Sequence, residues 1–376
     1  MAGAIVDLPA TVARSLGVRG RGATVLVVRL GALGDVVRTV PAVRLLARHW
    51  PEARFLWAVD TAWRTVLDGH PDLAGLVEIP RRAWGRALRQ PAAWPGLARS
   101  IAERCRALAD LAPALVVDFH GDLRSGLIGR LSRAPLRVGF EGHQQREGNR
   151  LFSTYRVPSV DRRTPRMERN LSLVRALGIA CEPLPPADLP LAGRGRDEAA
   201  AALGALAPGR AEAYAVVAPG ASRRQAYKKP PPEVLAAACE AIGRADATAL
   251  VVWGPGEEAD ARRVVGLAPR ATCLAPPTSL PALAALLERA RLFVGGDSGP
   301  LHLACAVGCP VVGIYGPTDP RVNQPWAVPH RVVYPRDRVY SGRRSVDRPA
   351  GFAGLETADV VRAVADLWAA SPARAS

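Results

Sequence analysis

The chain repeats one hydrophobic pattern, in which a short apolar run ends in a polar or glycine-containing turn and an amphipathic segment follows. The first run, residues 24–30, reads TVLVVRL and is apolar apart from Thr24 and Arg29. A run without polar alternation indicates a strand that is buried on both faces, as in parallel sheets. Similar runs recur along the chain, at 54–59, 115–119, 213–218, 249–253 and 293–296. The pattern therefore predicts an α/β protein with parallel sheets.

A proline-rich break at 183–190 interrupts this pattern, and the same order of elements then begins again. We expect an N-terminal extension at 1–22 that is weakly helical and peripheral, a first Rossmann-like domain at 23–186 and a second at 187–376. The chain ends in a predicted helix at 358–370, which could pack back on the N-terminal domain. Because parallel sheets bind ligands at the carboxyl ends of their strands, a cleft between the two halves is the expected ligand site.

The composition of the chain indicates a folded globular protein and bears on the cell compartment in which it is expected. The chain has 376 residues, of which 49% are hydrophobic and 22% charged, as in folded globular proteins. It contains no apolar run of 18 residues, and residues 1–22 lack the apolar core of a signal peptide, so we expect no transmembrane segment. A cytoplasmic location follows, with peripheral attachment to the inner membrane left open. Six scattered cysteines lack the paired spacing of a zinc site, so we predict reduced thiols and no metal.

The formal net charge of +16 predicts an anionic partner. Its arginines are spread along the whole chain and are rarely interleaved with aromatic residues, which argues against a nucleic-acid interface. An anionic lipid headgroup or a phosphorylated sugar accounts for the same sign of charge.

The turn after the first apolar run, Gly31–Ala32–Leu33–Gly34–Asp35, is the first candidate for chemistry. A carboxylate at this point could simply favour the N-terminus of the next helix. A strand end, two glycines and an exposed carboxylate are also the geometry of an active-site turn, and we favour that interpretation of Asp35. Arg38, one helical turn later, and Arg124 could bind an anionic acceptor or be solvated surface residues.

The second half carries the only two lysines of the chain, Lys228 and Lys229, a few residues after Ser222. Every other cation in the sequence is an arginine, so a compact ammonium is indicated at this spot. With Ser222, these lysines suit the stabilisation of a phosphate.

Residues 293–320 form the most distinctive stretch, FVGGDSGPLHLACAVGCPVVGIYGPTDP. Asp297 and Ser298 can cap the predicted helix, and Pro300 fits its first turn. His302 falls one turn into this helix, so its ring is expected near the capped end, where a nucleotide or phosphate would lie.

Four segments, taken in order, resemble glycosyltransferase family 9, the lipopolysaccharide heptosyltransferases. They are VRLGALGDVVRTVPAVRLL, VVDFHGDLRSGLIGRL, RVGF and GGDSGPLHLACAVGCPVVGIYGPTDP, and the resemblance spans roughly residues 24–319. It implies a GT-B fold, with two Rossmann-like domains whose parallel sheets face each other across a cleft. It also implies an acceptor site on the first domain and a nucleotide-sugar site on the second. The implied reaction is an inverting transfer from ADP-L-glycero-D-manno-heptose to the Kdo or heptose of the inner core.

The resemblance also assigns roles to individual residues. Asp35 matches the general base, Lys228 or Lys229 matches the lysine that meets the donor phosphates, and Glu257 falls near the acidic residue of the donor pocket. The diphosphate and sugar contacts match one run of four residues, Asp297, Ser298, Gly299 and His302. His120 stands where the family more usually has glutamine, and we place it with Arg38 and Arg124 on the acceptor side.

The implied chemistry needs no cofactor beyond the ADP-sugar substrate. The chain has no Asp-x-Asp, the usual ligand pair for a metal that bridges a diphosphate, so local cations would take that role and the reaction would be metal-independent. Two departures qualify the match: Pro230–Pro232 follow the lysines where the family usually has an aromatic residue, and His120 replaces glutamine. The alternative to an enzyme is a catalytically inactive GT-B module that binds a nucleotide or glycan, and such a module has no reason to keep Asp35.

Overall fold

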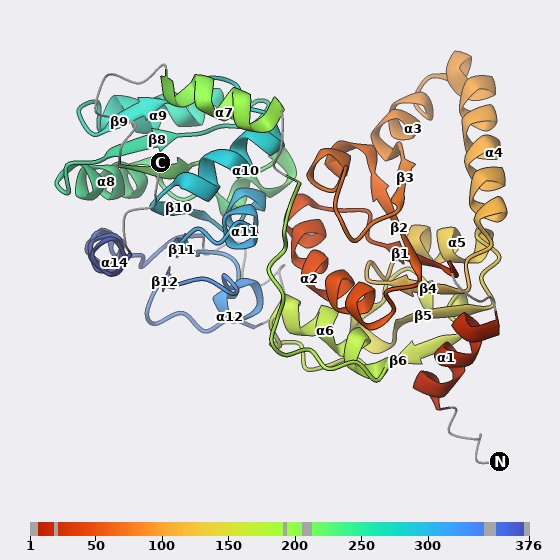
Figure 1. Cartoon of the computed structure of the whole chain (residues 1–376). Helices are drawn as coiled ribbons and strands as arrows, with labels where there is room; N and C mark the ends of the chain where they lie inside the picture. Colours follow the sequence, from red (N-terminus) through yellow and green to blue (C-terminus); the bar gives the residue numbers. More distant parts are fainter. Residues whose placement is uncertain (1–6, 19–21, 191–193, 205–212, 342–350, 372–376) are drawn as a thin grey trace. The chain divides into compact units, whose positions relative to one another are not determined.

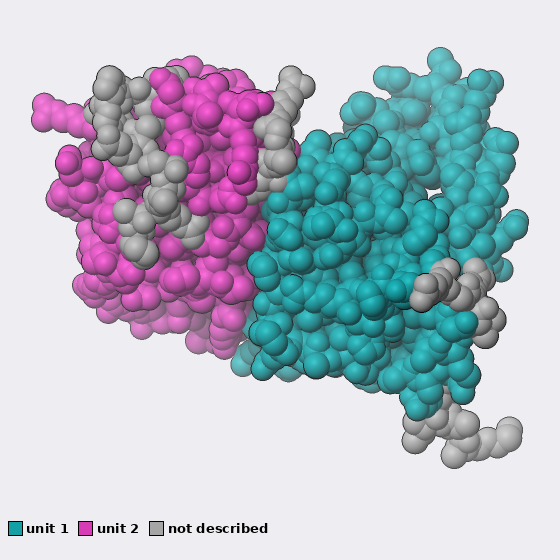
Figure 2. Space-filling model, in the orientation of Figure 1, with its two compact units in different colours: residues 1–190 teal, residues 191–376 magenta. Residues whose placement is uncertain are grey.

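The computed structural model describes residues 7–18, 22–190, 194–204, 213–341 and 351–371. Its contacts divide the chain into two compact units, unit 1 over residues 1–190 and unit 2 over residues 191–376, which Figure 2 colours separately. Each unit holds one six-stranded sheet in which every described strand pair is parallel. The predicted α/β class with two parallel sheets is therefore confirmed.

Unit 1 has the strand order β3-β2-β1-β4-β5-β6 (Figure 1). Its strands are β1 (Thr24–Val28), β2 (Arg54–Asp60), β3 (Gly75–Ile79), β4 (Leu115–Asp118), β5 (Leu136–Phe140) and β6 (Tyr155–Val157). Its α-helices are α1 (Leu8–Val18), α2 (Leu33–His49), α3 (Arg81–Ala87), α4 (Trp94–Leu111), α5 (Leu123–Leu131) and α6 (Arg166–Ala176). Short 3₁₀ turns complete it, η1 (Thr61–Val66), η2 (Pro91–Ala93), η3 (Gly142–Gln144) and η4 (Asn149–Leu151).

The order of this sheet fixes where a ligand can bind. β1 lies at the centre and pairs with β2 on one side and β4 on the other, so the chain direction across the sheet reverses between β1 and β4. Turns that leave two such strands diverge to opposite faces and open a crevice, the topological switch point of a doubly wound sheet. In unit 1 these turns carry Asp35 and His120.

The N-terminal extension differs from its prediction. Its helix α1 is not peripheral, because Leu8 and Val12 are buried and α1 contacts β4. The hydroxyl of Ser15 also donates a hydrogen bond to the carbonyl of Ala114 at 3.0 Å. In the sequence, only an apolar spacing of four residues indicates that this short helix packs against the sheet. That indication is weak because only two side chains carry it.

Unit 2 repeats the same topology, with the order β12-β11-β10-β7-β8-β9. Its strands are β7 (Tyr214–Ala218), β8 (Thr248–Val251), β9 (Thr272–Leu274), β10 (Leu292–Gly296), β11 (Val311–Ile314) and β12 (His330–Val333). Its helices are α7 (Arg194–Gly204), η5 (Arg223–Lys228), α8 (Pro232–Gly243), α9 (Glu258–Leu267), α10 (Leu280–Arg289), α11 (Gly299–Ala306), α12 (Pro320–Asn323) and α14 (Thr357–Ala370). The switch point lies between β7 and β10, which pair directly.

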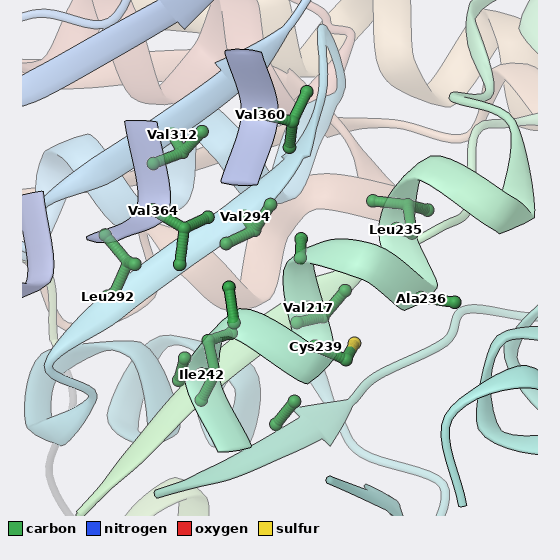
Figure 3. Packing of buried hydrophobic residues seen from close by; sticks show 14 of the residues in the cluster. Val217, Leu235, Ala236, Cys239, Ile242, Leu292, Val294, Val312, Val360 and Val364 are labelled. Atoms are coloured by element: carbon green, nitrogen blue, oxygen red, sulfur yellow. The ribbon is translucent and has the colours of Figure 1, made fainter. Parts of the chain in front are cut away.

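One apolar layer joins the sheet of unit 2 to α8 and α14 (Figure 3). Val217 and Val294 from the central strands meet Leu235 of α8 and Val360 of α14 in this layer. The final helix contacts α8 and the strands β10, β11 and β12 of unit 2. Among the described helices, none combines the length and the hydropathy needed to cross a bilayer.

Candidate active site

Asp35 lies in the first turn of α2, directly after the turn that leaves β1. Three guanidinium groups converge on its carboxylate: Arg38 at 2.7 Å, Arg29 at 3.0 Å and Arg166 at 3.3 Å. Burial raises the pKa of Asp35, but the three arginines outweigh burial and hold it well below its ordinary value. Asp35 is therefore ionised at neutral pH and fixed in position.

The cations around Asp35 exceed its single negative charge. Arg38 is buried and also donates to the carbonyl of Gly34 at 3.1 Å. Arg169, one turn after Arg166 on α6, adds a further guanidinium, and burial together with Arg166 and Arg38 lowers its pKa to about 10. The crevice at the end of β1 is thus positively charged, a setting that favours an anion.

The turn after β4 forms a second polar cluster in the same switch point. The buried carboxylate of Asp118 accepts hydrogen bonds from Ser125 and Asn149, each at 2.8 Å, and from the backbone amides of His120 and Gly121. Asn149 is fully buried, so the polar stretch 141–150 is anchored at this point.

His120 and Arg124 both contact Asp122, the residue that caps α5. Nε2 of His120 lies 3.2 Å from Oδ2 of Asp122, and Nε of Arg124 lies 3.4 Å from the same oxygen. Burial raises the pKa of Asp122, whereas His120, the Ser125 amide and Arg124 lower it, and the net direction is down. Arg124 is otherwise exposed, so the structure ties it to Asp122 rather than to Asp35.

In unit 2, Lys228 reaches into the switch point between β7 and β10. Its ammonium lies 2.8 Å from Oδ2 of Asp297, and both side chains are buried, at 7% and 5% exposure. Nε2 of His302 lies 3.6 Å from Oδ1 of the same carboxylate. Burial raises the pKa of Asp297, but Lys228 and His302 lower it further, so Asp297 stays ionised.

The two lysines are placed differently, which the sequence left open. Lys229 pairs with Asp260 on α9, whereas Lys228 faces Asp297. The backbone of Lys228 lies close to the backbone of Gly296, because a Cβ added at Gly296 would come within 2.8 Å of the Lys228 carbonyl oxygen. Only glycine therefore lets the chain of η5 lie over the end of β10.

The expected caps of α11 are formed only in part. Ser298 occupies the N-cap position and Pro300 the first turn, but the Ser298 side chain makes no capping hydrogen bond. Its hydroxyl is buried and has no hydrogen-bond partner among the described residues. Asp297 does not cap α11 either, since its carboxylate is taken by Lys228. Gly299 begins the helix, so its amide belongs to the free N-terminal turn.

Glu257 lies at the same edge of the sheet, beside the ends of β7 and β8. Its carboxylate accepts the amide of Gly254 at 3.1 Å, and a Cβ at Gly220 would come within 2.0 Å of Oε2. Ser222 is exposed at the start of η5 and caps nothing with its side chain. The structure thus groups Lys228, Asp297 and His302 tightly, with Glu257 at a neighbouring strand end and Ser222 outside the buried group.

Within the described parts of the chain, no group of three or more His, Cys, Asp or Glu side chains could hold a metal ion. Several residues of the site were missed by sequence reasoning, namely Arg29, Arg166, Arg169, Asp118, Asp122 and Asn149. Arg29 and Asp118 could have been found in the sequence because they stand at strand ends. Arg166 could not, because it lies 131 residues from Asp35 in the chain.

Comparison with known proteins identifies the family of the chain. The family model described as "Glycosyltransferase family 9 (heptosyltransferase)" matches residues 104–343. The chain is 26% identical over 308 residues to lipopolysaccharide heptosyltransferase 3 of Escherichia coli, covering 78% of this chain and 84% of that protein.

Two solved structures share the fold. A family 9 glycosyltransferase of Veillonella parvula has a TM-score of 0.76 and 21% identity, over 93% of this chain and 98% of its own. A heptosyltransferase of E. coli solved with ADP has a TM-score of 0.69 and 23% identity, over 92% and 99%. The shared architecture confirms the expected GT-B fold.

Proposed function

The chain belongs to glycosyltransferase family 9, and on that premise we propose which transfer it catalyses. It moves a heptose, or a related sugar, from an ADP-linked donor to an anionic acceptor of the lipopolysaccharide inner core. The relative from E. coli is a lipopolysaccharide heptosyltransferase, and a structural neighbour was solved with ADP. The observation that carries the proposal is that charged residues stand at the switch point of both sheets, a carboxylate among arginines in unit 1 and a held lysine in unit 2.

Unit 2 supplies what a departing diphosphate needs. The ammonium of Lys228 is a fixed cation, and the free amides at the start of α11 point a partial positive charge at the same place. The Ser298 hydroxyl is available to a phosphate oxygen, and the Glu257 carboxylate can accept hydrogen bonds from donor hydroxyls. Because Lys228 rather than Lys229 faces this turn, Lys228 is the residue that we assign to the phosphates.

Unit 1 supplies the acceptor side. An acceptor hydroxyl attacks the anomeric carbon of the donor as its proton passes to Asp35, and the bond from that carbon to the diphosphate breaks with inversion. General-base assistance of this kind contributes about 10²–10⁴ in rate. Arg38 and Arg166 then face the anionic groups of the acceptor, with Arg169 behind them, and no step requires a metal ion.

A helical face of unit 1 supports an acceptor that lies in a membrane. From residue 81 to 102 the chain has no acidic residue, and Arg86, Arg89 and Arg99 are exposed. Leu88, directly after α3, and Trp94, the first residue of α4, are 64% and 55% exposed. Figure 1 shows α3 and α4 next to each other in unit 1. Exposed aromatic and aliphatic side chains among arginines are typical of a surface that rests on anionic lipid headgroups. We assign this α3–α4 face to the anionic bilayer that holds the acceptor, which makes the protein peripheral to the cytoplasmic side of the inner membrane.

The donor is tested by a thermal-shift panel of ADP-, GDP- and UDP-linked sugars. A ligand that binds only the folded protein stabilises it by mass action, about 2.7 kcal/mol at 100 times Kd. We expect ADP-linked heptose to raise the melting temperature most, and Lys228→Met to remove most of that shift. A larger response to a GDP- or UDP-linked sugar would refute the donor assignment.

Transfer is tested with ADP-heptose and a Kdo-containing lipid A acceptor. Asp35→Ala should lose transfer while it still binds donor, and the exposed Asp68→Ala should behave as wild type. The anomeric configuration of the product, read by NMR, decides between inversion and retention, and activity in excess EDTA decides the metal question. Wild-type turnover in Asp35→Ala would remove Asp35 from the mechanism.

A further inference from the structure

His120 is held by Asp122 in a way that fixes which ring nitrogen carries a proton. Oδ1 of Asp122 accepts the Ser125 amide at 3.0 Å as the cap of α5, and Oδ2 receives Nε2 of His120 at 3.2 Å. An ionised carboxylate can only accept hydrogen bonds, so Nε2 must carry the proton of this contact. In the neutral ring, Nδ1 is then a lone-pair acceptor.

That Nδ1 atom is buried and has no hydrogen-bond partner among the described residues. The His120 side chain as a whole is 9% exposed. A buried ring nitrogen with a free lone pair is unfavourable unless something donates to it, so the position suits a proton or a donor brought by the reaction.

His120 stands beside the Asp35 cluster. The guanidinium of Arg29 donates to the carbonyl of Phe119, the residue before His120, and also pairs with Asp35 at 3.0 Å. The strands that lead into both turns are neighbours, with Val28 opposite Asp118. Electrostatic interaction with His120 is also among the causes that lower the pKa of Asp35, which agrees with this proximity.

Asp35 by itself is a poor place for a proton to stay. Three arginines stabilise its ionised form, and a group that is held ionised is a weak base. His120 has the opposite arrangement, since the carboxylate behind it stabilises its protonated form. This is the relation of histidine and aspartate in a hydrolase triad, in which the carboxylate orients the ring and stabilises the imidazolium.

We propose that the proton lost by the acceptor hydroxyl comes to rest on Nδ1 of His120, by way of Asp35. This rests on the glycosyl transfer proposed above. In the balanced step, the acceptor O–H bond breaks and its oxygen bonds to the anomeric carbon. The bond from that carbon to the diphosphate breaks, ADP leaves with the electron pair, and the proton ends on His120 as an imidazolium paired with Asp122. The ring returns its proton to solvent before the next turnover.

The charged groups that face His120 from the surrounding elements are Asp122 and Arg124 at the start of α5, Asp118 at the end of β4, and Arg29 and Asp35 from the β1 turn. None of these groups is an imidazole, so an acidic limb in the range where imidazoles ordinarily titrate would report His120.

The test is the pH dependence of kcat/KM with ADP-heptose and the Kdo-containing acceptor. In wild type we expect kcat/KM to fall about tenfold per pH unit on the acidic side of its profile, because one base must be unprotonated for the reaction. His120→Gln should lose that limb and be about 10²-fold slower at pH 8. Asp122→Asn, which keeps a capping side chain but removes the charge, should move the limb to lower pH. A wild-type profile that is flat down to pH 5, or an unchanged limb in His120→Gln, would overturn the proposal.

A readout that needs no turnover is the imidazole nitrogen spectrum of the full chain labelled with ¹⁵N-histidine. We expect the Nε2–H tautomer for His120 at pH 8. The Nδ1–H tautomer would refute the assignment of Nδ1 as the proton acceptor. If Asp35→Ala loses transfer while His120→Gln stays at the wild-type rate, the transferase function stands and the role of His120 falls. If wild type transfers no sugar from ADP-heptose, the function itself has failed, and the tautomer still decides on His120.

Discussion

The pair formed by Lys228 and Asp297 should be the most costly polar interaction to break in unit 2. The two groups are 2.8 Å apart and almost fully buried. Lys228→Met removes the cation and leaves a buried carboxylate whose other close partner is His302. Removing one member of a buried ion pair costs about 3–5 kcal/mol. For a folding unit of this size, that corresponds to a fall in melting temperature of about 6–20 °C.

The adjacent lysine provides a matched control. Lys229 pairs with Asp260 at the surface, with side chains 27% and 37% exposed. Exposed pairs are worth about 0–1 kcal/mol, so Lys229→Met should melt within a few degrees of wild type. Calorimetry of the two variants, with hydrogen exchange to confirm that unit 2 is affected, makes the comparison. Equal and small effects of both substitutions would refute the idea that burial sets the difference.

The same pair predicts a pH dependence with a definite sign. The folded-state pKa of Asp297 lies below its ordinary value of 3.8, so ionised Asp297 stabilises the fold above that value. The contribution is lost as the pH falls from about 4 toward the folded-state pKa. Wild type should therefore lose stability relative to Asp297→Asn below pH 4 and keep a constant difference from pH 5 to 8. A difference that grows as the pH falls would contradict the depressed pKa.

Three further outcomes follow from single contacts. Gly220→Ala should weaken donor binding about tenfold, because the new Cβ would displace the Glu257 carboxylate, and KM for ADP-heptose measures it. Asn149→Ala should lower the free energy of unfolding of unit 1 by about 1–3 kcal/mol, since a buried carboxylate loses a donor, and urea melting measures it. Trp94→Ser should reduce partitioning onto vesicles rich in anionic lipid about tenfold, while Leu267→Ser, at a 47% exposed site in unit 2, should not.

The fold was largely predictable because buried parallel strands have continuous apolar sequences. The run TVLVV of β1 and the run VVGI of β11 have few alternative structures open to them. Helix α1 was harder, because only Leu8 and Val12 carry its packing face. A pattern defined by two side chains does not separate a docked helix from a peripheral one.

The candidate site likewise contains residues that the sequence could predict and residues that it could not. Asp35 and Asp297 could be found because turns at strand ends are where parallel sheets carry function. The cations that surround Asp35 could not, since Arg166 comes from a helix 131 residues away and an arginine-rich chain gives no reason to single it out. The choice between Lys228 and Lys229 also needed the structure, because it depends on how the turn of η5 faces β10.

The carboxylates of Asp35 and Asp297 show why a strongly stabilised ionised acid is not the same as a good base. A low pKa measures how firmly the ionised form is stabilised, and Asp35 and Asp297 both owe theirs to neighbouring cations. For Asp297, which orders Lys228, firm ionisation is sufficient. For Asp35 it weakens proton affinity by the same free energy that fixes the group in place. On the proposal above, the proton in this chain therefore passes on to His120, which is backed by Asp122 and whose Nδ1 has no hydrogen-bond partner among the described residues.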